Sequence, residues 1–260
     1  QGEITLKLLD CLDIKYYVIT SESTKEDIEN AVKCASDEFA KGKCFAFVVK
    51  KGSLKNDNKV KYANDYPLTR EEAVNLIIKN SDESDIFVST TGKLSRELFE
   101  AREAMEQGHK RDFLTVGSMG HSSMIALSIA KEKKNRRVFC LDGDGAMLMH
   151  MGSVAVLGAN SPENYIHVLI NNGAHETVGG VPTVSECVDY EKIALACGYK
   201  KVYKAENEEE VINSVNSAKG DVGPVLIEIK TNLLSRADLG RPTTTPIQNR
   251  DAFMDFLKEN

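Results

Sequence analysis

Short hydrophobic runs alternate with longer segments of mixed polarity along the chain. Residues 86–89, 137–141, 165–170 and 225–229 are rich in β-branched or aromatic side chains and end at turn-forming residues, as buried parallel strands do. The segments between these runs have lengths and patterns that are typical of helices. The alternation predicts an α/β fold built on a doubly wound parallel sheet with helices on both faces.

Several of the expected helices have recognisable start signals. Thr24 followed by Asp27 opens a helix that should run to about residue 40, and Thr69 with Glu72 has the spacing of a capping box. A single helix is expected over residues 147–159, between two of the strands.

The chain divides into two parts of unequal length. Residues 1–50 predict an amphipathic helix followed by a strand, a helix and a second strand. Residues 51–66 are largely polar and charged, which indicates a linker. Residues 67–260 are expected to form the larger domain.

Composition limits the classes of function. The net charge is -6 and the basic residues form no patch, which argues against a nucleic-acid partner. The six cysteines are scattered without a CxxC motif, so reduced thiols are expected rather than disulfides or a zinc site. The sequence shows no membrane-length apolar run and no signal peptide. We expect a cytoplasmic protein with no membrane partner.

The most informative pattern is a pair of polar motifs, each following a hydrophobic run. Gly143-Asp144-Gly145 closes one run and Asn171-Asn172 closes the next, with 25 residues between Gly145 and Asn171. Two parallel strands joined by a helix would bring both motifs to one edge of the sheet, where open α/β sheets bind ligands. Carboxylate and carboxamide oxygens suit Mg2+, and amides exposed by glycine suit a diphosphate.

Two further patches lie upstream. One stands at the mouth of an expected helix and contains Gly117, Ser118, Met119 and Gly120. Free amides and the positive end of the helix dipole favour an anion there, and a glycine-rich turn before a packing helix is the alternative. The other patch ends a predicted strand with Thr91 and Gly92.

Along the chain, the patch at Thr91 comes first, the patch at Gly117 second, and the pair of Gly-Asp-Gly and Asn-Asn third. This order resembles that of thiamine diphosphate (ThDP) enzymes, in which Gly-Asp-Gly is followed at a similar distance by Asn-Asn. Residues 173–183, Gly-Ala-His-Glu-Thr-Val-Gly-Gly-Val-Pro-Thr, are similar to the corresponding segment of phosphonopyruvate decarboxylases, with sulfopyruvate decarboxylases as the nearest relatives. The resemblance is strong over residues 68–235 and weaker on either side.

The resemblance implies roles for individual residues. The side chains of Asp144 and Asn172 and the carbonyl of Ala174 would bind Mg2+. Met119 would hold the cofactor in its bent conformation. The other cofactor-binding positions that it implies are Thr91, Gly92, Gly117, Ser118, Gly143, Gly145 and Ala146.

Basic residues near these patches are candidates for substrate contacts. His121 and His175 each follow a cofactor patch and are candidates for binding the substrate's anion or moving a proton, with a local backbone contact as the alternative. Arg236 and Arg241 are candidates for holding a phosphonate or sulfonate, and a surface loop is the alternative. His167 lies inside a predicted strand and is expected to be packed and hydrogen-bonded.

The implied activity is ThDP- and Mg2+-dependent decarboxylation of 3-phosphonopyruvate to phosphonoacetaldehyde and CO2. Sulfopyruvate or another small 2-oxo acid is the alternative within the family, and a non-catalytic diphosphate- or nucleotide-binding module is the alternative from another class. Residues 1–50 resemble the C-terminal part of the family's pyrimidine-binding domain, whose activating glutamate is therefore expected outside this chain. We expect a homo-oligomer, or a separate pyrimidine-binding domain or subunit, and little activity from the chain alone.

Overall fold

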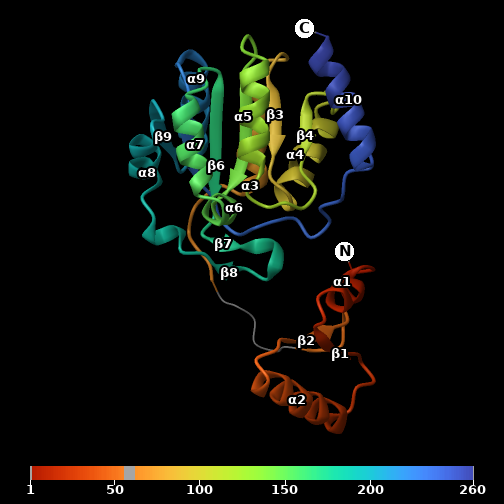
Figure 1. Ribbon diagram of the computed structural model, residues 1–260. Helices are drawn as coiled ribbons and strands as arrows, with labels where there is room; N and C mark the ends of the chain where they lie inside the picture. The colour runs from red at the N-terminus through yellow and green to blue at the C-terminus, as the bar shows by residue number, and fades with distance from the viewer. Residues whose placement is uncertain (1, 56–61, 260) are drawn as a thin grey trace. The chain divides into compact units, whose positions relative to one another are not determined.

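The computed structural model describes residues 2–55 and 62–259 of the protein (Figure 1). The chain divides into two compact units, Gln1–Lys59 and Val60–Asn260. This boundary falls within the expected linker, of which residues 56–61 lie outside the described part. Within the described residues, no helix has both the length and the apolar character needed to cross a membrane.

The first unit contains a parallel pair of strands connected by a helix. Thr24 caps that helix, and its side chain and that of Asp27 each accept a hydrogen bond from the other's backbone amide. The expected start of the helix is thus confirmed. The elements of this unit are α1 (Thr5–Cys11), β1 (Lys15–Ile19), α2 (Lys25–Ala40) and β2 (Phe45–Val49).

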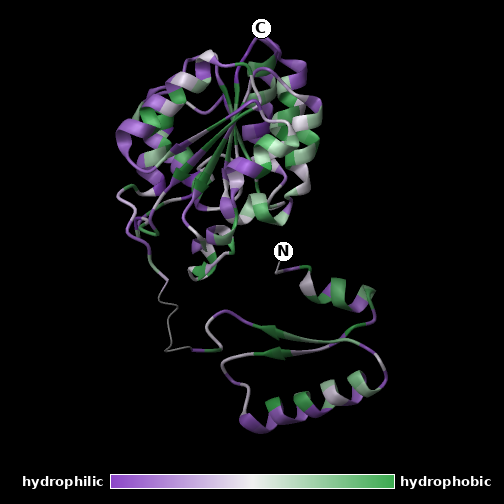
Figure 2. Ribbon diagram, turned by 90° about the vertical axis from the view of Figure 1, so that its left-hand side faces the viewer, coloured by the Kyte–Doolittle hydropathy of each residue, from purple (hydrophilic) through white to green (hydrophobic). Residues whose placement is uncertain are grey.

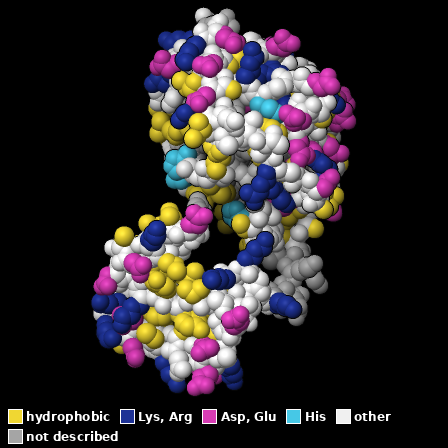
Figure 3. Space-filling model, turned by 90° about the vertical axis from the view of Figure 1, so that its right-hand side faces the viewer, with side chains coloured by type: hydrophobic (Ala, Val, Ile, Leu, Met, Phe, Trp, Pro, Cys, Tyr) yellow, Lys and Arg dark blue, Asp and Glu magenta, His cyan; other side chains and the backbone are white. Residues whose placement is uncertain are grey.

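Large hydrophobic side chains remain exposed on the first unit (Figure 3). They include Phe39 of α2 and Phe47 and Val49 of β2. Helix α2 is hydrophobic on its side facing the strands and polar on the other (Figure 2). Within the described residues, each of the two strands has one unpaired edge. The unit therefore presents apolar surface and strand edges that an additional layer or strand would cover.

The second unit is built on a six-stranded, fully parallel sheet with the strand order β4-β3-β5-β6-β10-β9. The strands are β3 (Ile86–Ser89), β4 (Asp112–Leu114), β5 (Val138–Gly143), β6 (Tyr165–Asn171), β9 (Lys201–Ala205) and β10 (Val225–Lys230). The α-helices are α3 (Arg70–Lys79), α4 (Lys93–Ala104), α5 (Ser122–Glu132), α6 (Asp144–Met149), α7 (Gly152–Asn160), α8 (Tyr190–Cys197), α9 (Glu208–Gly220) and α10 (Pro246–Lys258). Two short strands, β7 (Ala174–His175) and β8 (Val181–Pro182), pair antiparallel beyond the sheet, and two 3-10 turns, η1 (Glu176–Val178) and η2 (Ser185–Cys187), lie nearby.

Helices cover both faces of this sheet. Helices α3, α4 and α9 pack on one face, around residues such as Phe87 and Phe139. Helices α5, α7, α8 and α10 pack on the other, around Val88 and Tyr165. Neighbouring residues of one strand point to opposite faces, so a sheet covered on both sides needs strands that are hydrophobic throughout. The expected doubly wound α/β fold is confirmed.

One expected helix is interrupted. The segment predicted as a single helix over residues 147–159 forms α6 and α7, because His150 leaves the helical conformation with φ -130° and ψ 46°. Helix α6 begins at Asp144, directly at the end of β5, whereas α7 packs on the sheet through Val154 and Leu157. The break allows the two helices to take different directions. The capping box of Thr69 and Glu72 is present as expected.

Candidate functional site

The predicted motifs meet at the carboxyl end of the second unit's sheet. Strands β5 and β6 are neighbours, and Gly143 lies opposite Ile170 in their pairing. Strand β3 lies on the other side of β5, while the chain leaves β3 for the outer strand β4. The strand order reverses between β3 and β5, which is the position where doubly wound sheets bind ligands.

A cavity of about 300 Å³ opens at this position. Its lining includes most of the residues that the sequence singled out: Thr91, Gly92, Met119, Gly143, Asp144, Gly145, Ala146, Asn172, Ala174 and His175. Residues far apart in the sequence therefore lie around one cavity. Three predicted residues, Gly117, Ser118 and His121, are not among those that line it.

Of these three residues, Gly117 contacts a residue of the cavity wall. The amide of Gly117 donates a hydrogen bond to Oγ1 of Thr91 at 3.0 Å, joining two of the predicted patches. His121 is exposed, its Nδ1 lies 3.2 Å from the carbonyl oxygen of Ser118, and its ring packs edge-on against His150. His121 thus makes the local backbone contact that was the alternative to a substrate-binding role.

Asp144 is a buried carboxylate at the first turn of α6, with 3% of its surface exposed. Burial raises its pKa, and the hydroxyl of Thr183 partly offsets this by donating a hydrogen bond to Oδ2 at 2.6 Å. No lysine or arginine of the described residues forms an ion pair with Asp144. A buried carboxylate without a cationic partner is unfavourable, and a bound metal ion would relieve this cost.

Asn172 and Ala174 place further oxygen atoms at the same cavity. Oδ1 of Asn172 accepts a hydrogen bond from the amide of Ala174 at 3.1 Å, which fixes the turn that carries both residues. Both residues are buried and line the cavity with Asp144. Carboxylate, carboxamide and carbonyl oxygens form the donor set that Mg2+ prefers. The residues present therefore fit a magnesium ion that also carries a diphosphate.

Two glycines at the cavity have different surroundings. A Cβ at Gly145 would lie 2.5 Å from the ring of His175 and 3.3 Å from Cε of Met119. A Cβ at Gly143 would meet nothing within 4 Å. The backbone at Gly143 is thus open to a ligand, whereas His175 and Met119 rest on Gly145. Met119 belongs to neither of the unit's two hydrophobic core clusters.

A network of charged residues that the sequence did not point to forms one wall. Glu176 accepts hydrogen bonds from Arg70 at 2.6 Å and from Lys93 at 2.9 Å. Arg70 also donates two hydrogen bonds to Glu97, at 2.5 and 2.7 Å. Asn172 donates to Glu176 through Nδ2 at 3.3 Å. The network anchors the segment after β6 to helices α3 and α4.

The pKa values of the two carboxylates in this network are shifted in opposite directions. Burial opposes ionisation of Glu176, but the charge of Arg70 and hydrogen bonds from Ser235, Lys93 and Arg70 lower its pKa overall. Burial raises the pKa of Glu97 despite the two hydrogen bonds from Arg70. Spacing along the sequence gave no signal for this network because Arg70 and Glu176 are 106 residues apart.

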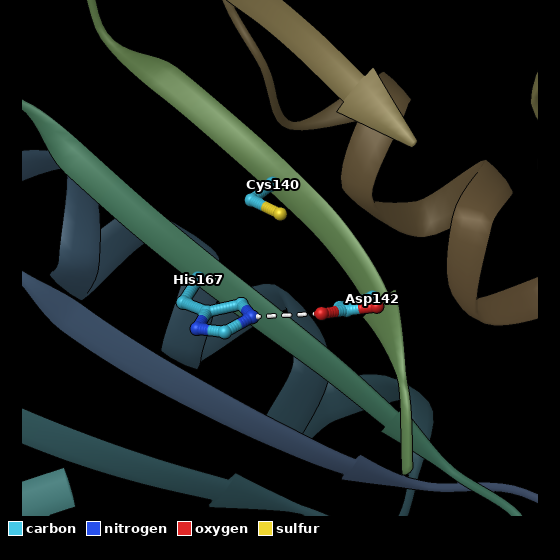
Figure 4. Close-up of side chains that lie close together, drawn as sticks. All are labelled: Cys140, Asp142 and His167. Carbon is cyan, nitrogen blue, oxygen red and sulfur yellow. Dashed lines mark ion pairs between the residues drawn. The ribbon is translucent and has the colours of Figure 1, made fainter. Parts of the chain in front are cut away.

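A second group of buried polar side chains lies inside the sheet, on the neighbouring strands β5 and β6 (Figure 4). Nε2 of His167 on β6 lies 3.5 Å from Oδ2 of Asp142 on β5, and its Nδ1 lies 2.9 Å from the hydroxyl of Tyr199. Oδ1 of Asp142 accepts a hydrogen bond from the amide of Gly143 at 3.0 Å. Burial raises the pKa of the nearby Cys140 thiol. His167 is packed and hydrogen-bonded as expected, and the pair supports the strand end from which Asp144 projects.

Arg236, a candidate for holding a phosphonate, is engaged elsewhere. It forms ion pairs with Glu71, at 2.8 Å, and with Glu100 and Asp238. Neither Arg236 nor Arg241 is among the residues that line the cavity. Two other cations, Arg70 and Lys93, do line it.

Comparison with known proteins shows the family. The sequence family described as "Thiamine pyrophosphate enzyme, C-terminal TPP binding domain" matches residues 90–229, which is more than half of the chain. The chain belongs to the thiamine pyrophosphate enzymes. This family's cofactor is ThDP, and the matched region contains all the cavity residues that the sequence predicted.

Among curated proteins, relatives of this thiamine pyrophosphate enzyme include two kinds of decarboxylase. Phosphonopyruvate decarboxylase of Streptomyces viridochromogenes is 34% identical over 189 residues, covering 73% of this chain and 46% of the relative. Sulfopyruvate decarboxylase subunit beta of Methanocaldococcus jannaschii is 34% identical over 158 residues, covering 59% and 80%. The same subunit of Methanococcus maripaludis is 29% identical, covering 74% of this chain and 99% of the relative.

The fold is also found in a solved structure. A protein from Mycobacterium smegmatis, described as a candidate thiamin diphosphate-dependent enzyme, superposes with a TM-score of 0.53 at 17% identity. The superposition covers 68% of this chain and 34% of the other. This thiamine pyrophosphate enzyme spans about half the length of the phosphonopyruvate decarboxylases that it matches.

Proposed function

We propose that the second unit binds the diphosphate of ThDP through Mg2+, and that the protein decarboxylates 3-phosphonopyruvate to phosphonoacetaldehyde and CO2. The observation that carries the proposal is the buried Asp144 carboxylate, which has no cationic partner among the described residues and shares a cavity with Asn172 and Ala174. The 34% identity to phosphonopyruvate decarboxylases supports the choice of substrate.

In this proposal the residues around the cavity have different roles. Asp144, the side chain of Asn172 and the carbonyl of Ala174 hold the metal, while the amides near Gly92 and Gly143 face the diphosphate. Met119 supports the bend of the cofactor, which supplies the electron sink for loss of CO2. His175, which rests on Gly145 inside the cavity, is positioned to contact the substrate or move a proton.

Sulfopyruvate is the second candidate substrate. This chain covers 99% of the sulfopyruvate decarboxylase beta subunit from Methanococcus maripaludis and 80% of the one from Methanocaldococcus jannaschii. A sulfonate and a phosphonate have similar size and shape but differ in charge. Lys93 and Arg70 at the cavity wall are both paired with Glu176 and favour neither anion, so only a direct comparison of the two substrates separates them.

We also propose that a complete active centre needs a pyrimidine-binding surface in addition to the second unit. The first unit, with its parallel strand pair and exposed Phe47 and Val49, fits the C-terminal part of such a domain. Further strands would pair with its open edges and cover its apolar face. The remaining surface would come from a homo-oligomer, or from another domain or subunit, in line with the subunit organisation named for the sulfopyruvate relatives.

A substrate panel tests the proposal. Phosphonopyruvate, sulfopyruvate and pyruvate are incubated with the protein, ThDP and Mg2+, with and without a pyrimidine-binding subunit from a sulfopyruvate decarboxylase, and CO2 and aldehyde are measured. Preferential release of phosphonoacetaldehyde supports phosphonopyruvate as the substrate. Preferential conversion of sulfopyruvate selects the second candidate. Tight, Mg2+-dependent ThDP binding without turnover of any of the three acids under either condition would overturn the decarboxylase assignment.

A further inference from the structure

A second cavity, of about 1150 Å³, lies at the amino ends of strands β3, β4 and β5. This is the opposite end of the sheet from the cofactor cavity, near the C-terminus in Figure 1. Its walls come from the segments that precede these strands, from the ends of α4 and α5, and from the end of α10. None of its lining residues belongs to the candidate cofactor site.

Two arginines that line this cavity are almost completely buried. Arg111 and Arg136 each expose 7% of their surface. Arg111 donates hydrogen bonds to the carbonyl oxygen of Asp82 at 2.6 Å and to Oε1 of Gln107 at 2.8 Å. Arg136 donates through Nε to the carbonyl oxygen of Ser84 at 2.9 Å.

All of these acceptors are electrically neutral. Arg136 also donates to the carbonyl oxygen of Phe256 at 3.4 Å, and its Nη2 has no acceptor among the described residues. In the described part of the chain, neither guanidinium forms an ion pair with a carboxylate. Burial lowers the pKa of both groups, and the positive charge of Arg102 adds to this effect for Arg111.

The neighbouring Arg102, by contrast, has a carboxylate as its partner. It is completely buried, and it donates two hydrogen bonds of 2.9 Å to the two carboxylate oxygens of Asp112. Buried charges in proteins are normally paired in this way. Carbonyl dipoles at the ends of α4 and α5 offset only part of a unit charge. Asp85 and Asp112 lie close enough to Arg111, and Asp85 and Glu259 close enough to Arg136, to favour the charged guanidinium. Unlike Arg102, however, neither arginine has a carboxylate in direct contact within the described residues.

Residues at the rim of the cavity carry both signs of charge. Lys134 is exposed there, and Lys110 pairs with Glu259 at 3.2 Å. Glu83, Glu106 and Glu132 also border the cavity, but within the described residues none of them forms an ion pair with the buried arginines. Among the described groups that hydrogen-bond to Arg136, none accepts from Nη2, so this buried nitrogen keeps a free donor beside the cavity.

We propose that this cavity binds a small phosphorylated polyanion, with Arg111 and Arg136 as its buried cationic groups and Lys134 at its rim. Guanidinium groups suit phosphate oxygens in charge and geometry. The cavity is large enough for a small metabolite. The ring of Phe256 is already covered by the Arg136 guanidinium at 4.0 Å, so charge rather than base stacking is the recognising element.

Isothermal titration with inorganic phosphate, inorganic diphosphate and ADP tests this proposal. The titrations are made in EDTA, so that Mg2+-dependent binding at the other end of the sheet is suppressed. We expect one equivalent of diphosphate or ADP to bind, and the dissociation constant to rise about tenfold or more in Lys134→Glu and in Arg136→Gln, as for loss of a charged hydrogen bond. Lys33→Glu, on α2 of the first unit, makes the same change in net charge as Lys134→Glu and should leave binding unchanged.

Three results would overturn the proposal. The first is the absence of saturable binding for all three probes. The second is equal weakening by Lys33→Glu and Lys134→Glu, which would mean that only net charge matters. The third is loss of binding in Asp144→Ala, which would place the anion at the cofactor cavity. Because Lys134 is exposed, its variant decides the question even if Arg136→Gln does not fold.

Discussion

Replacing Asp144 by Asn should have little effect on stability without the metal and a large effect with it. Asp144 is buried and forms no ion pair with a lysine or arginine of the described residues, and its side chain accepts a hydrogen bond from the hydroxyl of Thr183. The carboxamide oxygen of Asp144→Asn can still accept that hydrogen bond, and the buried charge is removed. Without Mg2+, we therefore expect the free energy of unfolding to change by less than about 1 kcal/mol.

With Mg2+ and ThDP present, the same substitution should remove most of the stabilisation by ligand. A ligand at about 100 times its Kd stabilises by about 2.7 kcal/mol. For a unit of this size that corresponds to a rise in Tm of roughly 5–11 °C. Thermal unfolding followed by circular dichroism, with and without Mg2+ and ThDP, measures both effects on one sample.

A matched control distinguishes a ligand carboxylate from a structural one. Asp112 is equally buried but is paired with Arg102. Asp112→Asn should cost about 3–5 kcal/mol without Mg2+ because a buried arginine loses its counter-ion, yet the rise in Tm caused by Mg2+ and ThDP should persist. A normal ligand-induced rise in Asp144→Asn, or destabilisation of that variant as large as that of Asp112→Asn, would refute the reasoning.

Other residues give further tests. Met119→Ala should lower kcat by about 10–100-fold with little change in Tm, because the side chain lines the cavity outside both core clusters; steady-state kinetics and thermal unfolding check this. Glu97→Gln should cost about 3–5 kcal/mol in urea unfolding by leaving Arg70 partly unpaired. Hydrogen bonding from Lys219 lowers the pKa of Asp82 below 3.8. The interaction of Asp82 with Lys219 contributes under about 1 kcal/mol to the free energy of unfolding at neutral pH. This contribution is lost as the pH falls through the lowered pKa, so the free energies of unfolding of Asp82→Asn and wild type should converge in acid.

The fold was largely predictable because its strands are buried on both faces. Such strands are almost continuously hydrophobic, so runs such as residues 137–141 and 165–170 stand out from the helices between them. Capping at Thr24 and Thr69 is local chemistry and was also visible in the sequence. The break at His150 was not predictable, because no proline lies there and the change of direction depends on where α7 packs.

The candidate site was predictable where it consists of local motifs at strand ends. The motifs at Asp144 and Asn172 end neighbouring strands, so their proximity follows from the topology. The network of Arg70 with Glu97 and Glu176 could not be predicted, since a charged residue on a helix normally indicates a solvent-exposed face. Only the three-dimensional packing of α3 against the cavity turns that helix residue into part of the wall.

Isothermal titration of ThDP into the protein, with Mg2+ and then with EDTA, tests the central claim most directly. The account predicts one equivalent of ThDP whose binding requires Mg2+ and Asp144, and weak binding of thiamine, which lacks the diphosphate. Any ThDP that remains bound in EDTA should be unaffected by Asp144→Ala and weakened by Lys134→Glu. Asp144→Ala should bind ThDP in Mg2+ as weakly as wild type does in EDTA. Equally tight ThDP binding in Mg2+ and in EDTA, unaffected by Asp144→Ala, would contradict the assignment of Asp144, Asn172 and Ala174 as the metal site.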